Sequence, residues 1–114
     1  MKNALTTHVL DTYHGRPAAA VQGQLLGSDG AVLQSFQTDA NGRAGPLLEG
    51  DAFTPGTYAL RFSAADYFRA QGVSLPDPPF LDVVTLDFGV ADPATGYHVP
   101  LVLSPWSCAT YRGS

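Results

Sequence analysis

The segment LDVVTLDFGVA at Leu81–Ala91 decides the fold class, because apolar side chains alternate along it with polar or small ones. From Val84 onward, its apolar positions fall at every second residue, at Val84, Leu86, Phe88 and Val90, whereas Val83, Thr85, Asp87 and Gly89 point to the other face. Successive side chains of a β-strand point to opposite faces of the sheet. The segment therefore predicts a β-strand with one buried face and one face toward solvent.

Several other segments carry the residue types or the alternation that strands require. These segments are Thr57–Ser63, Tyr97–Leu103, Leu5–Thr12, Ala19–Leu26 and Ala31–Gln37. Ser28–Gly30 reads as the hairpin turn that joins the last two of them. Asp39–Gly42 reads as another turn, in which Asn41 and Gly42 suit a positive φ.

One segment, Ala64–Gln71, is expected to be helical. Ser63 is placed to cap its start, and Gly72 is placed to end it. Nine prolines and twelve glycines interrupt the rest of the chain at short intervals, as is typical of many short strands. Such strands with a lone helix predict one all-β domain over residues 1–114, either a sandwich or a barrel.

The composition permits a real core but leaves few charges for the surface. The chain has 114 residues, which is enough for one domain, and 45% of them are hydrophobic. Charged residues make up 14%, against roughly 25% in an average soluble protein. We therefore expect part of the surface to be buried against further copies of the chain.

The charge distribution excludes some classes of partner. The formal net charge is −4, and the six lysines and arginines are scattered, so no basic patch is available for nucleic acid. No apolar run is long enough to cross a membrane, and no signal segment is evident, so we expect a cytoplasmic protein. Cys108 is the single cysteine, which excludes an internal disulfide and suits a reducing compartment.

The three histidines are the first candidates for chemistry. His8 and His98 each fall on the less apolar side of their strands. They are either surface histidines without a task or proton acceptors, since neutral imidazole is the usual base near pH 7. His14 stands beside Gly15 and reads as an exposed loop residue.

Arg43 follows the Asn-Gly turn, where it is either a solvated loop arginine or a guanidinium that binds a planar, oxygen-rich substrate through two hydrogen bonds. The ending Tyr111–Ser114 places an aromatic residue and an arginine where chains usually fray. It is therefore either unstructured or pinned by a partner. No zinc-ligand spacing occurs, so we expect no metal site.

Two segments, at opposite ends of the chain, resemble the signatures of the transthyretin family. HVLDTYHGRPA at His8–Ala18 resembles the N-terminal signature, and YHVPLVLSPWS at Tyr97–Ser107 resembles the C-terminal one. Between them, the Asn-Gly-Arg turn, a strand, the helix and Asp77–Phe80 follow in the family's order. The resemblance covers essentially the whole chain.

Within that family, the Tyr-Arg-Gly-Ser ending and a His/Arg/His set mark the hydrolase branch. The resemblance implies catalytic roles for His8, Arg43 and His98. It implies that the tail shapes and closes the substrate pocket, through Tyr111, Arg112, Gly113 and Ser114. Cys108 departs from the family, which more often has an aromatic residue there.

The resemblance implies a transthyretin-like fold, which is a two-sheet β-sandwich with one short α-helix. It also implies a homotetramer, built as a dimer of dimers with active sites between the dimers. The implied reaction opens the six-membered ring of 5-hydroxyisourate, a product of urate oxidation, at an amide bond and without a cofactor. His98 would activate water, His8 would assist it or protonate the leaving nitrogen, and Arg43 would offset developing charge.

Two other interpretations of the chain are open. The first is a carrier that holds a hydrophobic ligand in the central channel of a transthyretin-like tetramer. The matched tail and the His/Arg/His set argue against it. The second is a structural sandwich domain of a larger extracellular protein, against which the lack of linkers and of a signal segment argues.

Overall fold

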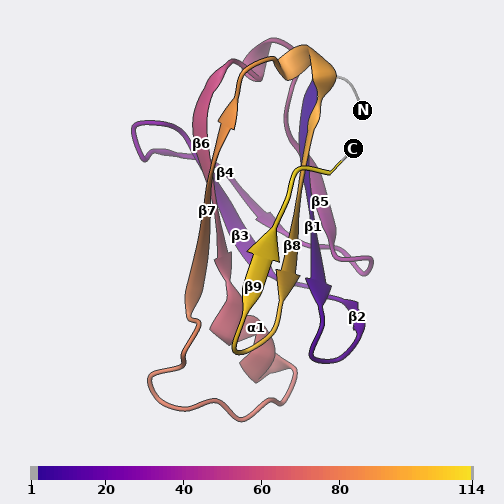
Figure 1. The fold of residues 1–114 in the computed structure, drawn as a ribbon, viewed down its shortest axis with the longest axis vertical. Helices are drawn as coiled ribbons and strands as arrows, with labels where there is room; N and C mark the ends of the chain where they lie inside the picture. The colour runs from indigo at the N-terminus through magenta and orange to yellow at the C-terminus, as the bar shows by residue number, and fades with distance from the viewer. Residues whose placement is uncertain (1–2, 114) are drawn as a thin grey trace.

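The computed structural model describes residues 3–113, which form two β-sheets packed face to face (Figure 1). One sheet, here called the β1 sheet, has the order β2-β1-β8-β9, with β5 also paired to β1. The other, the β3 sheet, has the order β4-β3-β6-β7. The predicted two-sheet sandwich is confirmed, and the barrel alternative is wrong.

The strands of each sheet are short. The β1 sheet contains β1 (Ala4–Asp11), β2 (Arg16–Pro17), β5 (Arg43–Glu49), β8 (Tyr97–Leu103) and β9 (Cys108–Thr110). The β3 sheet contains β3 (Gln22–Leu26), β4 (Val32–Gln37), β6 (Gly56–Ser63) and β7 (Val83–Val90). Strands β1 and β8 pair in parallel, whereas the other strand pairs are antiparallel. Single 3-10 turns, η1 (Gly50–Ala52) and η2 (Pro93–Thr95), precede β6 and β8.

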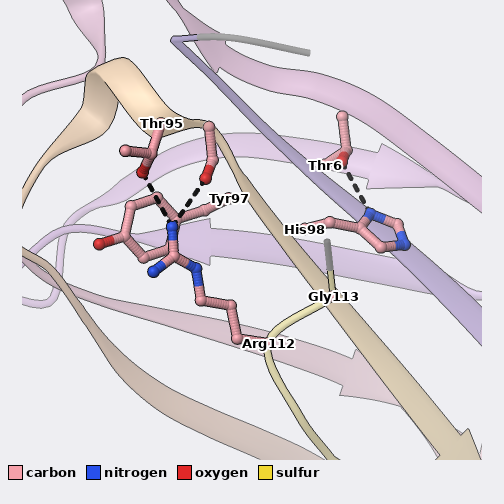
Figure 2. Close-up of a pocket in the computed structure, with 7 residues that line it drawn as sticks. Thr6, Thr95, Tyr97, His98, Arg112 and Gly113 are labelled. Atoms are coloured by element: carbon pink, nitrogen blue, oxygen red, sulfur yellow. Dashed lines mark hydrogen bonds between the residues drawn. The ribbon is translucent and has the colours of Figure 1, made fainter.

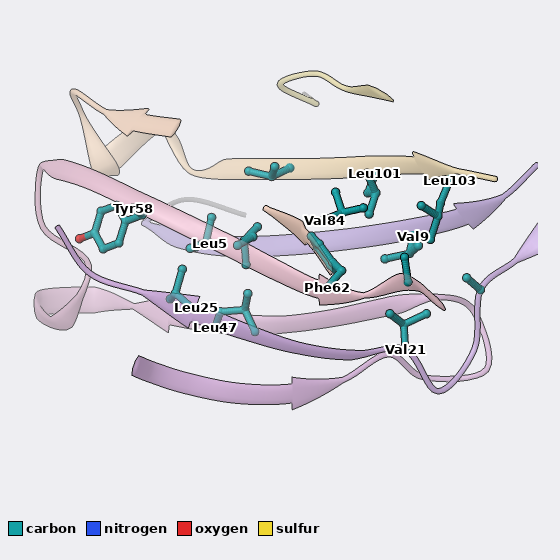
Figure 3. Close-up of a cluster of buried hydrophobic side chains, with 14 of the residues drawn as sticks. Leu5, Val9, Val21, Leu25, Leu47, Tyr58, Phe62, Val84, Leu101 and Leu103 are labelled. Carbon is teal, nitrogen blue, oxygen red and sulfur yellow. The ribbon is translucent and has the colours of Figure 1, made fainter. Parts of the chain in front are cut away.

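The core lies between the two sheets and is made by the predicted apolar rows. Figure 3 shows side chains from both sheets meeting there, among them Leu5, Val9, Leu101, Leu25, Phe62 and Val84. Leu60 and Phe62 of β6 are fully buried, whereas Arg61 between them is exposed. Because burial of one such side chain stabilises the fold by about 1.5–3 kcal/mol, these rows hold the sheets together.

Strands β2, β5 and β9 were not expected from the sequence. β2 and β9 have two and three residues, all exposed, so they carry no burial alternation. β5 contains Gly45-Pro46, which reads as a loop signal, and its pairing with β1 shifts register there. Proline is tolerated because β5 pairs only with β1 and so lies at the sheet edge.

Two local expectations about the backbone are wrong. Strand β3 starts at Gln22 rather than Ala19, because Ala20 has φ +63° and turns the chain. The Thr38 hydroxyl accepts the Val21 amide and donates to the Ala18 carbonyl, which satisfies the backbone of that turn. Asn41 does not have a positive φ.

The helix α1 spans Ala64–Ala70, one residue shorter than expected, and lies at one end of the sandwich (Figure 1). Ser63 makes no side-chain capping bond; the Ala64 and Ala65 amides donate instead to the Asp82 carbonyl. Gly72 follows the helix as predicted, with its amide bonded to the Arg69 carbonyl. No helix within residues 3–113 is long and apolar enough to cross a bilayer.

His14 is not the exposed loop residue that the sequence indicated, because it binds the buried carboxylate of Asp11. Asp11 accepts hydrogen bonds from the His14 amide at 2.9 Å, from His14 Nδ1 at 2.5 Å and from the Tyr67 hydroxyl at 2.7 Å. Burial raises the pKa of Asp11, but the bonds from His14 and Tyr67 outweigh it and leave that pKa below 3.8. Burial and Asp11 together raise the pKa of Tyr67 to about 12, so its hydroxyl stays a donor. The carboxylate thus ties the end of β1 to helix α1.

We expect Asp11→Ala to lower the free energy of unfolding by on the order of 3 kcal/mol near neutral pH, since it leaves buried donors unpaired. The pKa of Asp11 is lower in the folded state, so its contribution is complete above the ordinary value of 3.8. The difference between the two proteins should therefore shrink as the pH falls below 3.8. Urea denaturation over a pH series measures it.

The control is Asp66→Ala, because Asp66 is exposed and meets Arg69 only at 3.8 Å. It should leave stability nearly unchanged at each pH. An Asp11→Ala protein as stable as Asp66→Ala would contradict the structural role of the carboxylate.

Candidate active site

Three neighbouring strands of the β1 sheet place the three predicted catalytic residues on one face. Arg43 begins β5 directly opposite His8 on β1. On the other side of β1, His98 of β8 lies opposite Thr6. Directly opposed residues share a face of a sheet, and Thr6 and His8 share one because they are two residues apart on β1. Both alternate along β1 with buried residues, so the shared face is the outer face of the sheet.

The two histidines lie close together on that face. Their rings stack with centroids 6.3 Å apart and planes 29° apart. His98 Nδ1 is 2.8 Å from the Thr6 hydroxyl, which orients its ring (Figure 2). A pocket of about 380 Å³ opens beside His98, lined by Thr6, Thr95, Gly96, Tyr97, His98, Arg112 and Gly113.

The environment of His98 favours the neutral imidazole. Burial lowers the pKa of His98 below its ordinary 6.5, and Coulombic repulsion by Arg43, and by His8 when it is protonated, lowers it further. A histidine that is neutral at pH 7 has a free ring nitrogen to accept a proton. His98 therefore has the protonation state that a general base requires.

A tight turn delivers Arg43 to its place opposite His8. The Asp39 carboxylate accepts hydrogen bonds from the Asn41 and Arg43 amides at 2.8 and 3.0 Å. These bonds lower the pKa of Asp39, and the bond from the Arg43 amide has the larger effect. Gly42 has φ +75°, and a Cβ there would lie 2.4 Å from the Val9 carbonyl oxygen. Only glycine permits this approach of the turn to β1.

The pocket beside His98 does not contain all the predicted residues. Arg43 lines a separate hollow of about 420 Å³ between β4 and β5. Tyr111 lies with 61% of its surface exposed and lines a hollow next to β7. Ser114 lies outside the described residues. In a single chain, His98, Arg112 and Gly113 line one pocket, and His8 and Arg43 continue its face across β1 and β5.

The tail runs against His98. The Gly113 amide donates to the His98 carbonyl at 2.7 Å, and a Cβ on Gly113 would lie 2.7 Å from Cδ2 of the His98 ring. The described part of the tail is thus ordered against its own chain, where the sequence left open an unstructured tail or one pinned by a partner.

Thr6 and Thr95 are pocket residues that the sequence did not indicate. Thr6 meets His98 only because β1 and β8 pair in parallel, and strand order is not visible in an alternating pattern. Within residues 3–113, no three His, Cys, Asp or Glu side chains cluster as metal ligands would.

The fold and the site define a class of protein: a two-sheet sandwich with acid–base side chains on the outer face of one sheet. The sequence model of the HIUase/Transthyretin family matches residues 5–113. The chain belongs to this family.

Relatives of known name cover nearly the whole chain. It is 54% identical to 5-hydroxyisourate hydrolase of Ralstonia nicotianae, over 96% of this chain and 97% of the relative. The crystal structure of an (S)-allantoin synthase superposes with a TM-score of 0.94 at 41% identity, over 99% of this chain and 44% of the other. Klebsiella pneumoniae 5-hydroxyisourate hydrolase superposes with a TM-score of 0.84 at 28% identity, over 98% and 99% of the two chains.

We expect Arg43→Gln to raise the pKa of His98 toward 6.5, because it removes a positive charge that disfavours the imidazolium. NMR titration of the His98 ring protons measures the change. Arg69→Gln removes an exposed positive charge from helix α1 and should leave the His98 titration unchanged. An unaltered titration in Arg43→Gln would mean that its guanidinium does not act on His98.

Proposed function

We propose that this protein hydrolyses 5-hydroxyisourate by opening its six-membered ring. The observation that carries the proposal is the stacked pair of His98 and His8, opposite Arg43, with the pKa of His98 held below 6.5. The family and the names of the relatives that match nearly the whole chain support the substrate.

In the proposed reaction, His98 accepts a proton from water while the water oxygen bonds to the ring carbonyl carbon. Arg43 binds the carbonyl oxygen and offsets the negative charge that develops on it. The carbon–nitrogen bond then breaks, the nitrogen takes a proton from His8 or the protonated His98, and a carboxylate forms. Imidazole, guanidinium and water suffice for these steps.

The tail and the assembly complete the proposed pocket. Arg112 and Gly113 form one wall beside His98, and Tyr111 and Ser114 are proposed to close it. We further propose a homotetramer, a dimer of dimers, with the outer face of the β1 sheet buried between dimers. Leu10 supports this assembly, because it shares that face with His8 and is 38% exposed in the single chain.

A cytoplasmic setting is part of the proposal. The exposed thiol of Cys108 supports it, since exposed free thiols suit a reducing compartment.

Turnover is measured by generating 5-hydroxyisourate in place with urate oxidase and following its near-ultraviolet absorbance against spontaneous decay. His98→Asn and His8→Asn should each lower kcat by about 10²–10⁴, the usual cost of losing a positioned acid or base. Because the pKa of His98 lies below 6.5, kcat/KM should rise with pH through a midpoint below 6.5.

His14→Asn is the matched control, because His14 is bonded to Asp11 and lies outside the pocket. It should retain turnover while losing stability. Near-native turnover in both His98→Asn and His8→Asn would sink this mechanism. No acceleration by the assembled wild type would favour a ligand carrier instead.

We expect the wild type to sediment at four times the mass of one chain. Leu10→Glu should separate the tetramer into its two dimers and abolish turnover, because a buried unpaired carboxylate costs several kcal/mol. Leu33→Glu is the matched control, since Leu33 is an exposed leucine of β4 in the other sheet. It should leave the mass unchanged. A monomeric, fully active wild type would contradict the assembly.

A further inference from the structure

The side chain of Arg112 is bound to its own chain on the far side of the pocket from His98 (Figure 2). Its guanidinium carbon lies 3.8 Å from the centroid of the Tyr97 ring. One guanidinium nitrogen donates to the Thr95 hydroxyl at 2.9 Å and to the Gly96 carbonyl at 3.1 Å. This is the geometry of a cation–π contact supported by charge-assisted hydrogen bonds.

The next residue of the tail is the one that contacts His98. The Gly113 amide bonds to the His98 carbonyl, and the two residues form an isolated antiparallel bridge. Gly113 also lies so near the imidazole that a Cβ would meet it at 2.7 Å. The position of Gly113 therefore decides how much room the His98 ring has.

Backbone pairing alone holds this bridge poorly. Strand β9 pairs with β8 through Thr110 opposite Leu101, and Gly113 opposite His98 continues the same register. That register sets Tyr111 opposite Pro100, which has no amide to donate. The Pro100 carbonyl accepts the Thr110 hydroxyl instead, and β9 ends there. The bridge at Gly113 is thereby separated from the strand pairing that precedes it.

A bridge that stands alone must offset the entropy of ordering the residues that lead to it. Fixing one residue disfavours the ordered state by about 5- to 30-fold. Tyr111 contributes little, since most of its surface is exposed. The contacts of Arg112 with Tyr97, Thr95 and Gly96 are the remaining attachment between Thr110 and Gly113.

We propose that Tyr97 and Arg112 form a clamp that positions Gly113 against His98, so that Tyr97 is a positioning residue of the reaction. This inference rests on the proposed function for its catalytic consequence and on the geometry above for the clamp itself. Arg112 then acts through the backbone of its neighbour, with its guanidinium occupied by Tyr97, Thr95 and Gly96.

The clamp is tested directly by hydrogen exchange of the Gly113 amide in the assembled protein. Tyr97→Leu should speed exchange by about 2- to 5-fold, which is the range of an exposed cation–π contact. Arg112→Met also removes the charge-assisted bonds and should speed it by about tenfold or more. The double variant should exchange no faster than Arg112→Met, because both changes break one contact.

Two further proteins control this experiment. Tyr97→Phe keeps the aromatic ring and should keep most of the protection of the Gly113 amide. Arg69→Met removes an exposed arginine of helix α1 and should leave that exchange at the wild-type rate. If Tyr97→Leu fails to fold, because Tyr97 also contacts Phe53, Arg112→Met on the surface carries the test. Unchanged exchange in Arg112→Met would overturn the clamp.

Kinetics separate the clamp from direct substrate binding by Arg112. If Arg112 acts through the clamp, Tyr97→Leu and Arg112→Met should lower kcat/KM through the same one of its two parameters, kcat or KM. The kcat/KM of the double variant should be no lower than that of Arg112→Met. A rise in KM confined to Arg112→Met would contradict it. A wild type without turnover would overturn the proposed function and leave the exchange result standing.

Discussion

The parallel pairing of β1 with β8 joins two segments separated by 92 residues in the chain, and both the core and the candidate site depend on it. It runs from Leu5 opposite Tyr97 to Asp11 opposite Leu103. On the inner side, these strands supply much of the core; on the outer side, they set His8 beside His98. The buried Thr7 hydroxyl adds a bond to the Val99 carbonyl at 2.7 Å, which fastens the pair at its centre.

The edges of the β1 sheet complete the site around this pair. On one side, β5 carries Arg43 to β1, and the Gly42 turn sets where β5 begins. On the other side, β9 and the tail cover the free edge of β8 as far as His98. The strand pairing at each edge meets a proline where its ladder is interrupted, Pro46 of β5 on one side and Pro100 of β8, which faces the tail, on the other. Each interruption lies next to a residue of the site. Side chains and turns therefore position the site where backbone pairing is missing.

The electrostatics of the site and of the core use opposite solutions. His98 is kept neutral by burial and by nearby positive charge, which leaves it able to accept a proton. Asp11 is kept ionised by three hydrogen bonds, although it is fully buried. The first arrangement suits chemistry and the second suits stability, and the two lie on paired neighbouring strands, β8 and β1.

The sequence by itself determined the sandwich, the course of β6, β7 and β8, the lone helix and the identity of the histidines and Arg43 as candidates. Alternation along one strand is a local property, and the two family signatures are linear, so both are readable from residue order. The tertiary structure decided which strands are neighbours, and hence that Thr6 meets His98 and that Arg43 stands opposite His8. It also decided that His14 hydrogen-bonds to Asp11 and that the Arg112 guanidinium packs on the Tyr97 ring. These contacts depend on strand order and on side chains from distant segments, neither of which is encoded in a pattern with a period of two residues.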